Sequence, residues 1–410
     1  MDDEQSRVEG VATRKTVSLL SLLGIFLKLG CTSFGGPVAH IGYFRTEFVE
    51  RRRWVDDGTY ADLVALCNFL PGPASSQVGI SLGVLKGGIA GGLMAWLGFT
   101  LPSALLMIAF AGGYAALGFS GESGALHGLK IVAVAVIAQA VWGMGRTLCP
   151  DRFRATLAIL SAAAMLMSQF AWAQIAIIVA GALIGRRWIA ADPAAPQEAS
   201  RFGLSRRTGA LAWLLLIGLL VLLPVAAAVS QNGSLAVFDS FFRVGSLVFG
   251  GGHVVLPLLH HEVVAPGWVG NDAFLAGYGA AQALPGPLFT FSAYLGSVMS
   301  AGPGGVAGGL WALLAMFLPA LLLVIGALPW WETLRRRSGA QSALKGVNAA
   351  VVGLLVAALY DPVWTASIRS GSDFAVALAA FGALVFWKIS PLYVAIATAL
   401  VAALLAALVS

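Results

Sequence analysis

Two stretches of this chain combine helix-breaking residues with hydrogen-bond donors inside long apolar segments. The first contains Phe34-Gly35-Gly36-Pro37 and Asn68-Phe69-Leu70-Pro71-Gly72-Pro73, and the second contains Phe249-Gly250-Gly251-Gly252 and Gln282-Ala283-Leu284-Pro285-Gly286-Pro287. Proline removes a backbone donor and glycine adds backbone freedom, so each cluster stops a helix. The helix that resumes after a break presents free N–H groups and the positive end of its dipole. Such ends, converging in the middle of a membrane, would suit a compact oxyanion.

Side chains that suit the same anion lie close to these breaks. Lys28 and Arg243 occupy matching positions, and hydroxyl and amide groups follow the breaks. An ionisable residue in a membrane span is a functional candidate by default, and the near absence of carboxylates from the apolar runs disfavours a cation as substrate. The candidate substrate-binding residues are Lys28, Ser33, Gly35, Gly36, Asn68, Pro71, Gly72, Pro73, Ser75, Ser76 and Gln77, and then Arg243, Gly250, Gly251, Gln282, Pro285, Gly286, Pro287, Thr290 and Ser292.

Simpler interpretations of the same residues stay open. A Pro-Gly-Pro sequence can be a plain kink in a spanning helix. Ser and Thr side chains in spans often bond only to their own helix. Lys130 and Lys345, which also match each other, lie near the starts of apolar runs. A lysine there can extend its ammonium group to the membrane surface without touching a substrate.

The composition indicates a polytopic membrane protein surrounded by the lipid bilayer. Of its 410 residues, 59% are hydrophobic and 11% are charged, and the mean hydropathy is +0.86. Apolar runs long enough to span a bilayer recur from end to end. Residues 1–16 mix both charge signs and show no signal-peptide cleavage site. The net charge of +6 reflects loop arginines that set topology, so nucleic acid is not an expected partner.

No metal or other cofactor is expected. The three cysteines, Cys31, Cys67 and Cys149, lack the spacing of a metal site and are interpreted as small apolar residues. His253, His260 and His261 have no second cluster of ligands to accompany them. A homodimer is compatible with the sequence, which does not determine the oligomeric state.

The apolar runs follow one order twice. In the first half they cover 17–34, 38–53, 60–86, 88–117, 128–145, 155–170 and 171–185, and in the second half 241–259, 272–299, 304–328, 344–360, 374–387 and 390–409. Between the halves lie a linker at 186–207 and a helix at 210–229 without a counterpart. We therefore divide the chain into a first repeat at 12–190, a linker with an extra transmembrane helix at 191–232, and a second repeat at 233–410.

Matching residues support an internal duplication. Phe26, Gly30 and Phe34 match Phe241, Gly245 and Phe249 at an offset of 215, and Trp54-Val55 and Leu70 to Pro73 match Trp268-Val269 and Leu284 to Pro287 at 214. Pro102 matches Pro319 at 217, and Leu129-Lys130 matches Leu344-Lys345 at 215. Two unrelated apolar segments would not keep Trp, Pro and Lys in register.

The arginine bias of the loops reverses between matching positions. Loop 45–53 holds four Arg and its counterpart 260–268 holds none, whereas loop 118–127 holds none and its counterpart 330–343 holds three. Loop 146–154 holds three and its counterpart 361–373 holds one. Because cytoplasmic loops are rich in Lys and Arg, the two halves are predicted to be inserted in opposite senses.

This inverted topology requires segments that do not cross the membrane. Loop 45–53 is predicted inside and loop 118–127 outside, so the two apolar runs between them cannot both cross the membrane. The run 60–86 is therefore predicted to be re-entrant, with its turn at Pro71-Gly72-Pro73. An inverted second half then needs residues 17–50 to form a broken hairpin with its bend near Gly35. Interrupted segments in matching halves are the sequence signature of a secondary transporter's binding site.

At these residues the sequence resembles the chromate transporter family in its long two-domain form. The resemblance rests on Phe34-Gly35-Gly36-Pro37 with His40, the basic run to Trp54-Val55, Leu70-Pro71-Gly72-Pro73 and their second-half versions, and it covers nearly the whole chain. It implies an inner-membrane secondary transporter that exports chromate, a dianion shaped like sulfate, on the proton motive force and so confers chromate resistance. The second copy departs from the first with Gly252-His253 in place of Pro37-Val38.

Other functions remain as alternatives. A carrier of sulfate or another oxyanion would have the same charge and geometry to recognise. An anion channel can also contain inverted repeats and broken helices. An enzyme is not expected, because the spans show no convincing nucleophile–base pair or set of metal ligands.

Overall fold

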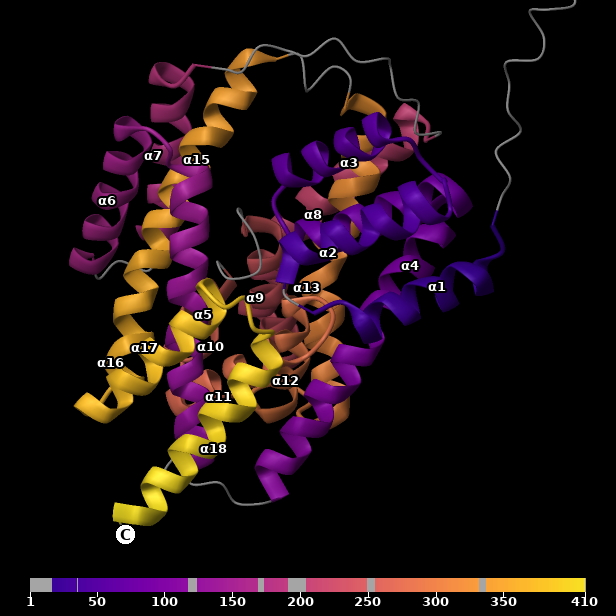
Figure 1. Cartoon of the computed structure of the whole chain (residues 1–410). Helices are drawn as coiled ribbons and strands as arrows, with labels where there is room; N and C mark the ends of the chain where they lie inside the picture. Colours follow the sequence, from indigo (N-terminus) through magenta and orange to yellow (C-terminus); the bar gives the residue numbers. More distant parts are fainter. Residues whose placement is uncertain are drawn as a thin grey trace, which may run out of the picture.

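The computed structural model describes residues 17–34, 36–116, 124–168, 173–190, 204–248, 255–331 and 337–409. Over these residues the chain is helical and contains no strand, which confirms the predicted all-α fold (Figure 1). Five helices are long and apolar enough to span a membrane, namely Ala74–Tyr114, His127–Leu148, Arg206–Ser230, Gly305–Trp330 and Ser338–Ser367. The chain is therefore a multi-pass membrane protein.

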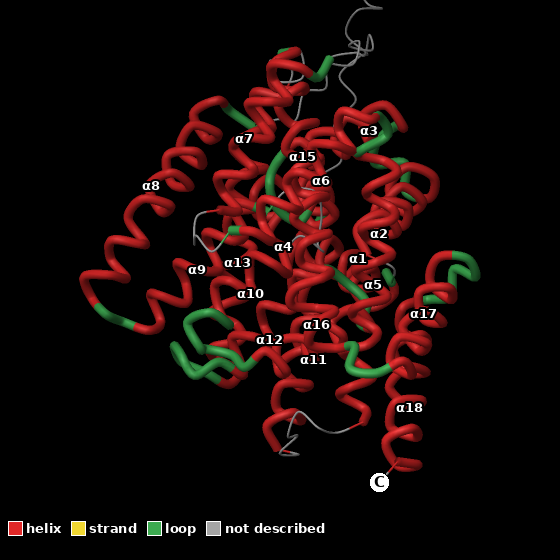
Figure 2. Tube along the Cα trace, turned by 90° about the vertical axis from the view of Figure 1, so that its left-hand side faces the viewer, coloured by secondary structure: helices red, strands yellow, loops and turns green. Residues whose placement is uncertain are grey.

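The helices repeat in the order that the sequence predicts. The first half contains α1 (Leu19–Thr32), α2 (Gly36–Arg45), η1 (Thr46–Arg51), α3 (Asp57–Phe69), α4 (Ala74–Ala116), α5 (Gly124–Leu148), α6 (Arg152–Met167) and α7 (Ala173–Trp188). The second contains α9 (Gly233–Leu247), α10 (Val255–Val263), α11 (Asn271–Ala283), η3 (Leu288–Thr290), α12 (Phe291–Val298), α13 (Gly305–Ala327), η4 (Leu328–Trp330), α15 (Ser338–Ala358), η5 (Leu359–Trp364), α16 (Thr365–Ser367), α17 (Gly371–Val385) and α18 (Pro391–Val409). The unmatched helix α8 (Arg206–Ser230) runs along an outer edge against α9 and α13 (Figure 2).

The Pro-Gly-Pro sequences form turns between separate helices rather than kinks within one helix. The first turn separates α3 from α4, and the second separates α11 from η3. Gly72 has φ +113° and Gly286 has φ +92°. Side chains with a Cβ atom avoid this backbone region, so glycine is required at both turns.

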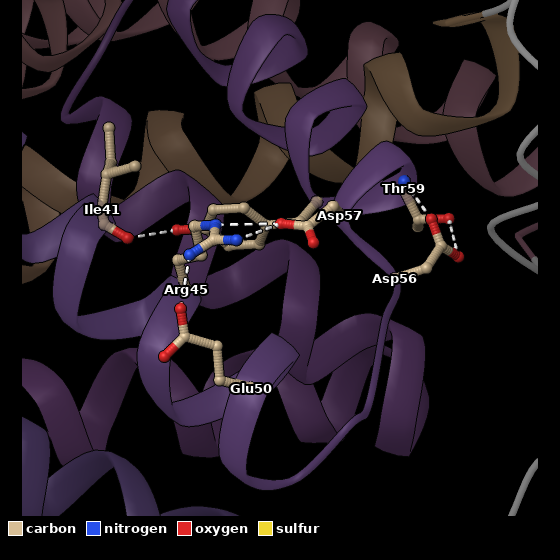
Figure 3. A network of polar contacts seen from close by, with 7 residues as sticks. Ile41, Arg45, Glu50, Asp56, Asp57 and Thr59 are labelled. Carbon is tan, nitrogen blue, oxygen red and sulfur yellow. Dashed lines mark hydrogen bonds and ion pairs between the residues drawn. The ribbon is translucent and has the colours of Figure 1, made fainter.

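A polar network fixes the connection from α2 to α3 at one end of the molecule (Figure 3). The Arg45 guanidinium pairs with Glu50 at 2.5 Å and with Asp57 at 2.7 Å. The Asp56 carboxylate accepts the Thr59 N–H at 2.8 Å and so caps the start of α3. This connection leads into α3, a helix of 13 residues that is too short to be one of the five candidate spans.

Contacts between the ends of these segments bring the start and the end of each first-half hairpin close together. The Val17 N–H donates to the Lys86 carbonyl at 3.4 Å, and the Lys86 ammonium lies 5.9 Å from the centre of the Trp54 ring. The start of α1, the start of α3 and the kink of α4 at Gly87–Gly88 therefore lie together. In the second half the Ser300 N–H donates to the Trp268 carbonyl at 3.0 Å and closes the corresponding hairpin.

The two halves run in opposite directions and interlock. In Figure 1, α5 rises through the molecule and α15 descends beside it. Helix α5 packs against α17 and α18 of the second half, and α15 packs against α6 and α7 of the first. The end of α7, the starts of α8 and α15, and the connection from α2 to α3 gather at the upper end of Figure 1. This upper end is the one that the arginine-rich loops predict to be cytoplasmic.

The two ends of the molecule are packed differently. At the lower end, α11 packs against α5 and α18, and the Leu275 side chain is fully buried. At the upper end, the matching helix α3 packs mainly on α4, and Figure 1 shows it apart from α15 and α7. Ala61, which matches Leu275, is exposed. Helix α11 thus packs into the interlocked core at the lower end, whereas the matching helix α3 at the upper end packs mainly on α4.

Candidate substrate-binding site

The Pro-Gly-Pro turn of each half binds the broken helix of the other half. The Gly72 N–H donates to the Val248 carbonyl at 2.6 Å, and the Gly286 N–H donates to the Ser33 carbonyl at 2.9 Å. Ser33 and Val248 are equivalent residues at the ends of α1 and α9, so the two bonds are equivalent as well. The predicted breaks therefore meet in one place. Both glycine N–H groups are occupied by these bonds.

Close backbone packing holds the broken helices against the long ones. A Cβ atom at Gly30 would lie 2.7 Å from the Phe99 carbonyl oxygen, and one at Gly245 would collide with the Met316 carbonyl oxygen. Phe99 and Met316 are equivalent residues of the matching helices α4 and α13. The same contact in both halves gives the four elements fixed positions around the turns.

Polar groups gather around the first turn of α4 in the first half. Ser75, Ser76 and Gln77 are buried there, and the His40 Nδ1 and Ser75 Oγ atoms lie 3.3 Å apart within hydrogen-bond distance. The His40 ring also lies against the Phe99 ring, 5.2 Å between centroids, and Thr100 is the next residue. Gln77 Nε2 donates to the Pro71 carbonyl at 2.6 Å and so joins this cluster to the turn.

Many polar atoms of this cluster have no hydrogen-bond partner among the described residues. These atoms are Ser33 Oγ, His40 Nε2, Ser76 Oγ, Gln77 Oε1 and Thr100 Oγ1, and all five residues are at least nine-tenths buried. Buried polar groups in proteins are almost always bonded, so such a group of unbonded atoms indicates a place for water or a ligand. Hydroxyl and imidazole groups can donate to an anion, and the first turn of α4 adds free N–H groups and the positive end of its dipole.

The equivalent positions in the second half are largely apolar. Phe289, Phe291 and Phe317 occupy the places of Ser75, Gln77 and Thr100. Two second-half hydroxyls, those of Thr290 and Ser292, are bonded within the protein, and Ser103 of the first-half helix α4 is one of the partners of Thr290. Thr290 Oγ1 donates to the Pro287 carbonyl at 2.8 Å and lies 2.7 Å from Ser103 Oγ, and Ser292 Oγ donates to the Phe289 carbonyl at 2.8 Å. The two copies of the motif share a backbone but differ in chemistry.

The predicted cations do not gather at the unbonded polar atoms. Lys28 is exposed on α1, whose buried face carries Leu22, Phe26, Leu29 and Gly30. The Arg243 guanidinium pairs with the carboxylates of Asp239 at 3.1 Å and Glu262 at 2.9 Å. Lys28 and Arg243 therefore match in sequence but differ in their surroundings.

The two matching lysines near the starts of apolar runs, Lys130 and Lys345, also differ. Lys130 is fully buried, with its Nζ atom 2.5 Å from the carboxylate of Asp272 at the start of α11. Lys345 is half-buried and donates to the Ala190 carbonyl, beyond the end of α7, at 2.8 Å. Lys130 thus joins α5 to the start of α11.

The remaining predicted residues fall into four groups. Asn68 is exposed at the end of α3, whereas Gln282 is half-buried and bonded to Tyr278. Gly36 begins α2 with φ +76°. The prolines that flank the turns, Pro71, Pro73, Pro285 and Pro287, lie in or beside the buried core. Gly35, Gly250 and Gly251 lie outside the described residues.

A comparison with known protein families shows to which family the chain belongs. The profile of the family described as "Chromate transporter" matches residues 20–186 and again residues 235–405. The chain belongs to the chromate transporter family. The two matches coincide with the two interlocked halves, and α8 falls in the interval between them. The resemblance seen in the sequence motifs is thereby confirmed.

Curated relatives agree with this family over most of their length. The "Chromate transport protein" of Pseudomonas aeruginosa is 30% identical over 347 residues, which are 84% of this chain and 81% of the relative. The "Probable chromate transport protein" of Synechococcus elongatus is 28% identical over 83% of this chain and 84% of the relative. The "Chromate transport protein" of Cupriavidus metallidurans is 28% identical over 85% of this chain and 84% of the relative. No solved structure matches the chain.

Two of the buried polar residues, His40 and Thr100, are not among the candidate residues predicted from the sequence. His40 follows Gly36-Pro37 by one helical turn, and Thr100 lies two residues before Pro102. A usable signal was the comparison of the two halves, because Thr100 is polar where its equivalent Phe317 is aromatic. Asp239 and Glu262 are not among the predicted residues either, because they lie just outside the predicted apolar run 241–259.

Proposed function

We propose that this chain is a secondary transporter that exports a tetrahedral oxyanion, chromate in the first place, across the cell inner membrane. The proton motive force would drive export, and the cell would gain chromate resistance. The observation that carries this proposal is the cluster of unbonded buried donors around the first turn of α4. The names of the curated relatives support chromate as the substrate.

The chemistry of the cluster suits a dianion that must be both bound and released. Ser33, Ser76 and Thr100 offer hydroxyl donors, and His40 offers an imidazole nitrogen. A tetrahedral oxyanion has acceptor oxygens on every side, so donors from several elements can share one ion. The described residues of this cluster include no lysine or arginine, so no fixed counter-charge would retain the ion. The partial positive charge at the start of α4 supplies a weaker attraction.

We propose that the second half mainly supports the substrate site of the first half and does not itself bind the oxyanion. Its aromatic residues Phe289, Phe291 and Phe317 cannot replace hydroxyl donors, and its turn holds the end of α1 through the bond from Gly286 to Ser33. The domain division at 12–190, 191–232 and 233–410 belongs to the same proposal. The family matches at 20–186 and 235–405 support that division.

Flux in reconstituted vesicles tests the function. Purified protein would be placed in liposomes, and labelled chromate and sulfate uptake would be followed with and without an imposed pH gradient. We expect saturable chromate uptake that a pH gradient accelerates and that chromate on the opposite side stimulates. Uptake no faster than in protein-free vesicles would contradict transport. Chromate uptake that is not stimulated by chromate on the opposite side would indicate a channel. Sulfate uptake faster than chromate uptake would identify sulfate as the preferred substrate.

A further inference from the structure

A group of three charged side chains lies on the broken hairpin of the second half, outside the polar cluster around α4. Arg243 of α9 lies between Asp239, one turn earlier in the same helix, and Glu262 of α10. The guanidinium also lies 3.4 Å from Ser240 Oγ. We name Asp239, Arg243 and Glu262 the acidic triad, because two carboxylates share one cation.

The charges in the acidic triad do not balance. The Asp239 side chain is 8% exposed; its Oδ2 atom accepts from Arg243, but its Oδ1 atom is buried without a hydrogen-bond partner. Burial of an ionised carboxylate with an unbonded oxygen is unfavourable. A proton on that oxygen would make the triad neutral overall and would turn the unbonded acceptor into a donor.

Among the described residues, the elements packed against α9 supply no further charge that would neutralise the triad. Helix α9 packs against α8, α10 and α13. The sequence of α13 contains no titratable residue, and the charged residues of α8, Arg206 and Arg207, lie at the end of that helix remote from α9. On α10, His261 is exposed beside Glu262, and His260 lies 3.0 Å from Asn271 Oδ1.

The triad lies between the molecular surface and the point where the two halves meet. The side chains of Arg243 and Glu262 are 25% and 20% exposed, so the group is partly accessible from outside the protein. Helix α10 ends at Val263, just before the loop that the arginine bias places outside the cell. Val248, whose carbonyl binds the Gly72 turn, follows Arg243 by five residues. A charge change in the triad therefore occurs close to the element that holds the first-half turn.

The first half has no equivalent group. Gly24 occupies the position of Asp239, and Lys28 occupies the position of Arg243 but is exposed. Glu47, the equivalent of Glu262, pairs with Arg51 at 3.1 Å and Arg52 at 2.6 Å. At these matching positions the excess of carboxylate over cation occurs only in the second half, whereas the unbonded donors of the polar cluster around α4 lie in the first.

We propose that Asp239, held beside Glu262 by Arg243, binds the proton that is exchanged for the oxyanion. The proton would pass from external water to Asp239 Oδ1 and leave on the cytoplasmic side, with no other bond formed or broken. The proposal rests on the proposed oxyanion transport and adds the place of the coupling ion. It divides the two tasks between the halves, with the oxyanion at the start of α4 and the proton on α9.

Two transport modes of the same reconstituted protein test this proposal. Chromate–chromate exchange without a pH gradient requires the substrate site alone. A pH gradient of one unit can drive up to about tenfold accumulation for each coupled proton, since tenfold corresponds to about 1.4 kcal/mol. We expect Asp239→Asn to retain exchange within about threefold and to lose the accumulation, and we expect Glu262→Gln to reduce it. Glu47→Gln, at the position that matches Glu262, should accumulate chromate like the unaltered protein.

The outcomes are distinguishable. Gradient-driven accumulation by Asp239→Asn equal to that of the unaltered protein would overturn the assignment. The assignment would also be overturned if Asp239→Asn and Glu262→Gln each lost exchange and accumulation in equal proportion. That result would mean that the ion network is only structural. If Asp239→Asn cannot be purified, a second measurement tests the proposal. The protons released when chromate binds to Glu262→Gln in detergent would be counted. Release equal to that of the unaltered protein would overturn the proposal. Absence of exchange by the unaltered protein would instead contradict oxyanion transport.

Discussion

At the scale of single residues, the glycine of each Pro-Gly-Pro turn has two roles. It adopts the backbone conformation of the turn, and it forms a hydrogen bond to the other half. Gly72 and Gly286 both have positive φ, and each donates its N–H across the molecule. A Cβ atom at Gly72 would lie 2.8 Å from Gln77 Nε2, and one at Gly286 would lie 3.1 Å from Ser103 Cβ. Any side chain therefore meets both backbone strain and a close neighbour.

We expect Gly72→Val and Gly286→Val to lower transport by more than about tenfold, because strain of about 1–3 kcal/mol would displace the turn and its hydrogen bond. Gly112→Val provides a matched control, since Gly112 lies within α4 with open space around it. Flux would be normalised to the amount of protein in the membrane. Near-normal flux through Gly72→Val would separate that turn from the substrate site.

At the scale of elements, an ion pair explains why α11 is fastened to α5. Lys130 is fully buried, and the Asp272 carboxylate 2.5 Å away is half-exposed. Loss of one partner of a buried pair leaves an uncompensated charge, which is strongly destabilising. Lys345 occupies the equivalent position in α15 but bonds to a backbone carbonyl near the surface.

Asp272→Asn should therefore lower the free energy of unfolding by up to about 3 kcal/mol, because it leaves the Lys130 ammonium buried without its counter-charge. Lys345→Gln should change it by about 1 kcal/mol or less, as expected for a partly exposed group. Thermal unfolding of the purified variants in detergent measures both changes. Equal stability of the two variants would show that the pair does not fasten α11.

The elements were largely predictable from the sequence because hydropathy and helix breakers act locally. The run 60–86 and its break at Pro71-Gly72-Pro73 correspond to α3 and the first part of α4, and the run 210–229 corresponds to α8. The partners of these elements were not predictable, because no local signal says that α5 packs against α18 or that Gly72 binds Val248.

The candidate site was predictable only in part for the same reason. Ser33, Ser76 and Gln77 were selected by their closeness to the breaks, and the structure places them among the buried unbonded groups. Lys28 was selected by its position in an apolar run, but the sequence does not say which face of α1 is buried. His40 and Thr100 needed the packing of α2 against α4 to bring them near the same turn.

At the scale of the whole molecule, the opposite directions of the halves predict which loops share a side. Residue 52 lies in the connection from η1 to α3, and residue 264 follows α10. Cysteines placed at 52 and 264 should react with an impermeant reagent from opposite sides of the membrane. Labelling of both from the same side would contradict the inverted arrangement.

The different packing of the two ends gives a second whole-molecule prediction. Ala61 on α3 is exposed, whereas its equivalent Leu275 on α11 is fully buried. Ala61→Cys should react quickly with a water-soluble thiol reagent in native membranes, and Leu275→Cys should react only after denaturation. Similar reaction rates at the two positions would mean that both ends are equally packed.

The central claim is that one polar site, built by the first half, holds the oxyanion. Ser76 and Thr290 occupy the same position in the two halves, but Ser76 Oγ is unbonded and Thr290 Oγ1 is bonded to Pro287 and Ser103. Equilibrium binding of labelled chromate to purified Ser76→Ala and Thr290→Ala tests this claim directly. A hydrogen bond to a charged group contributes about 1.5–3 kcal/mol, so Ser76→Ala should raise the chromate Kd by about tenfold or more, while Thr290→Ala leaves it unchanged. An unchanged Kd for Ser76→Ala, or an equal rise in both variants, would contradict the account.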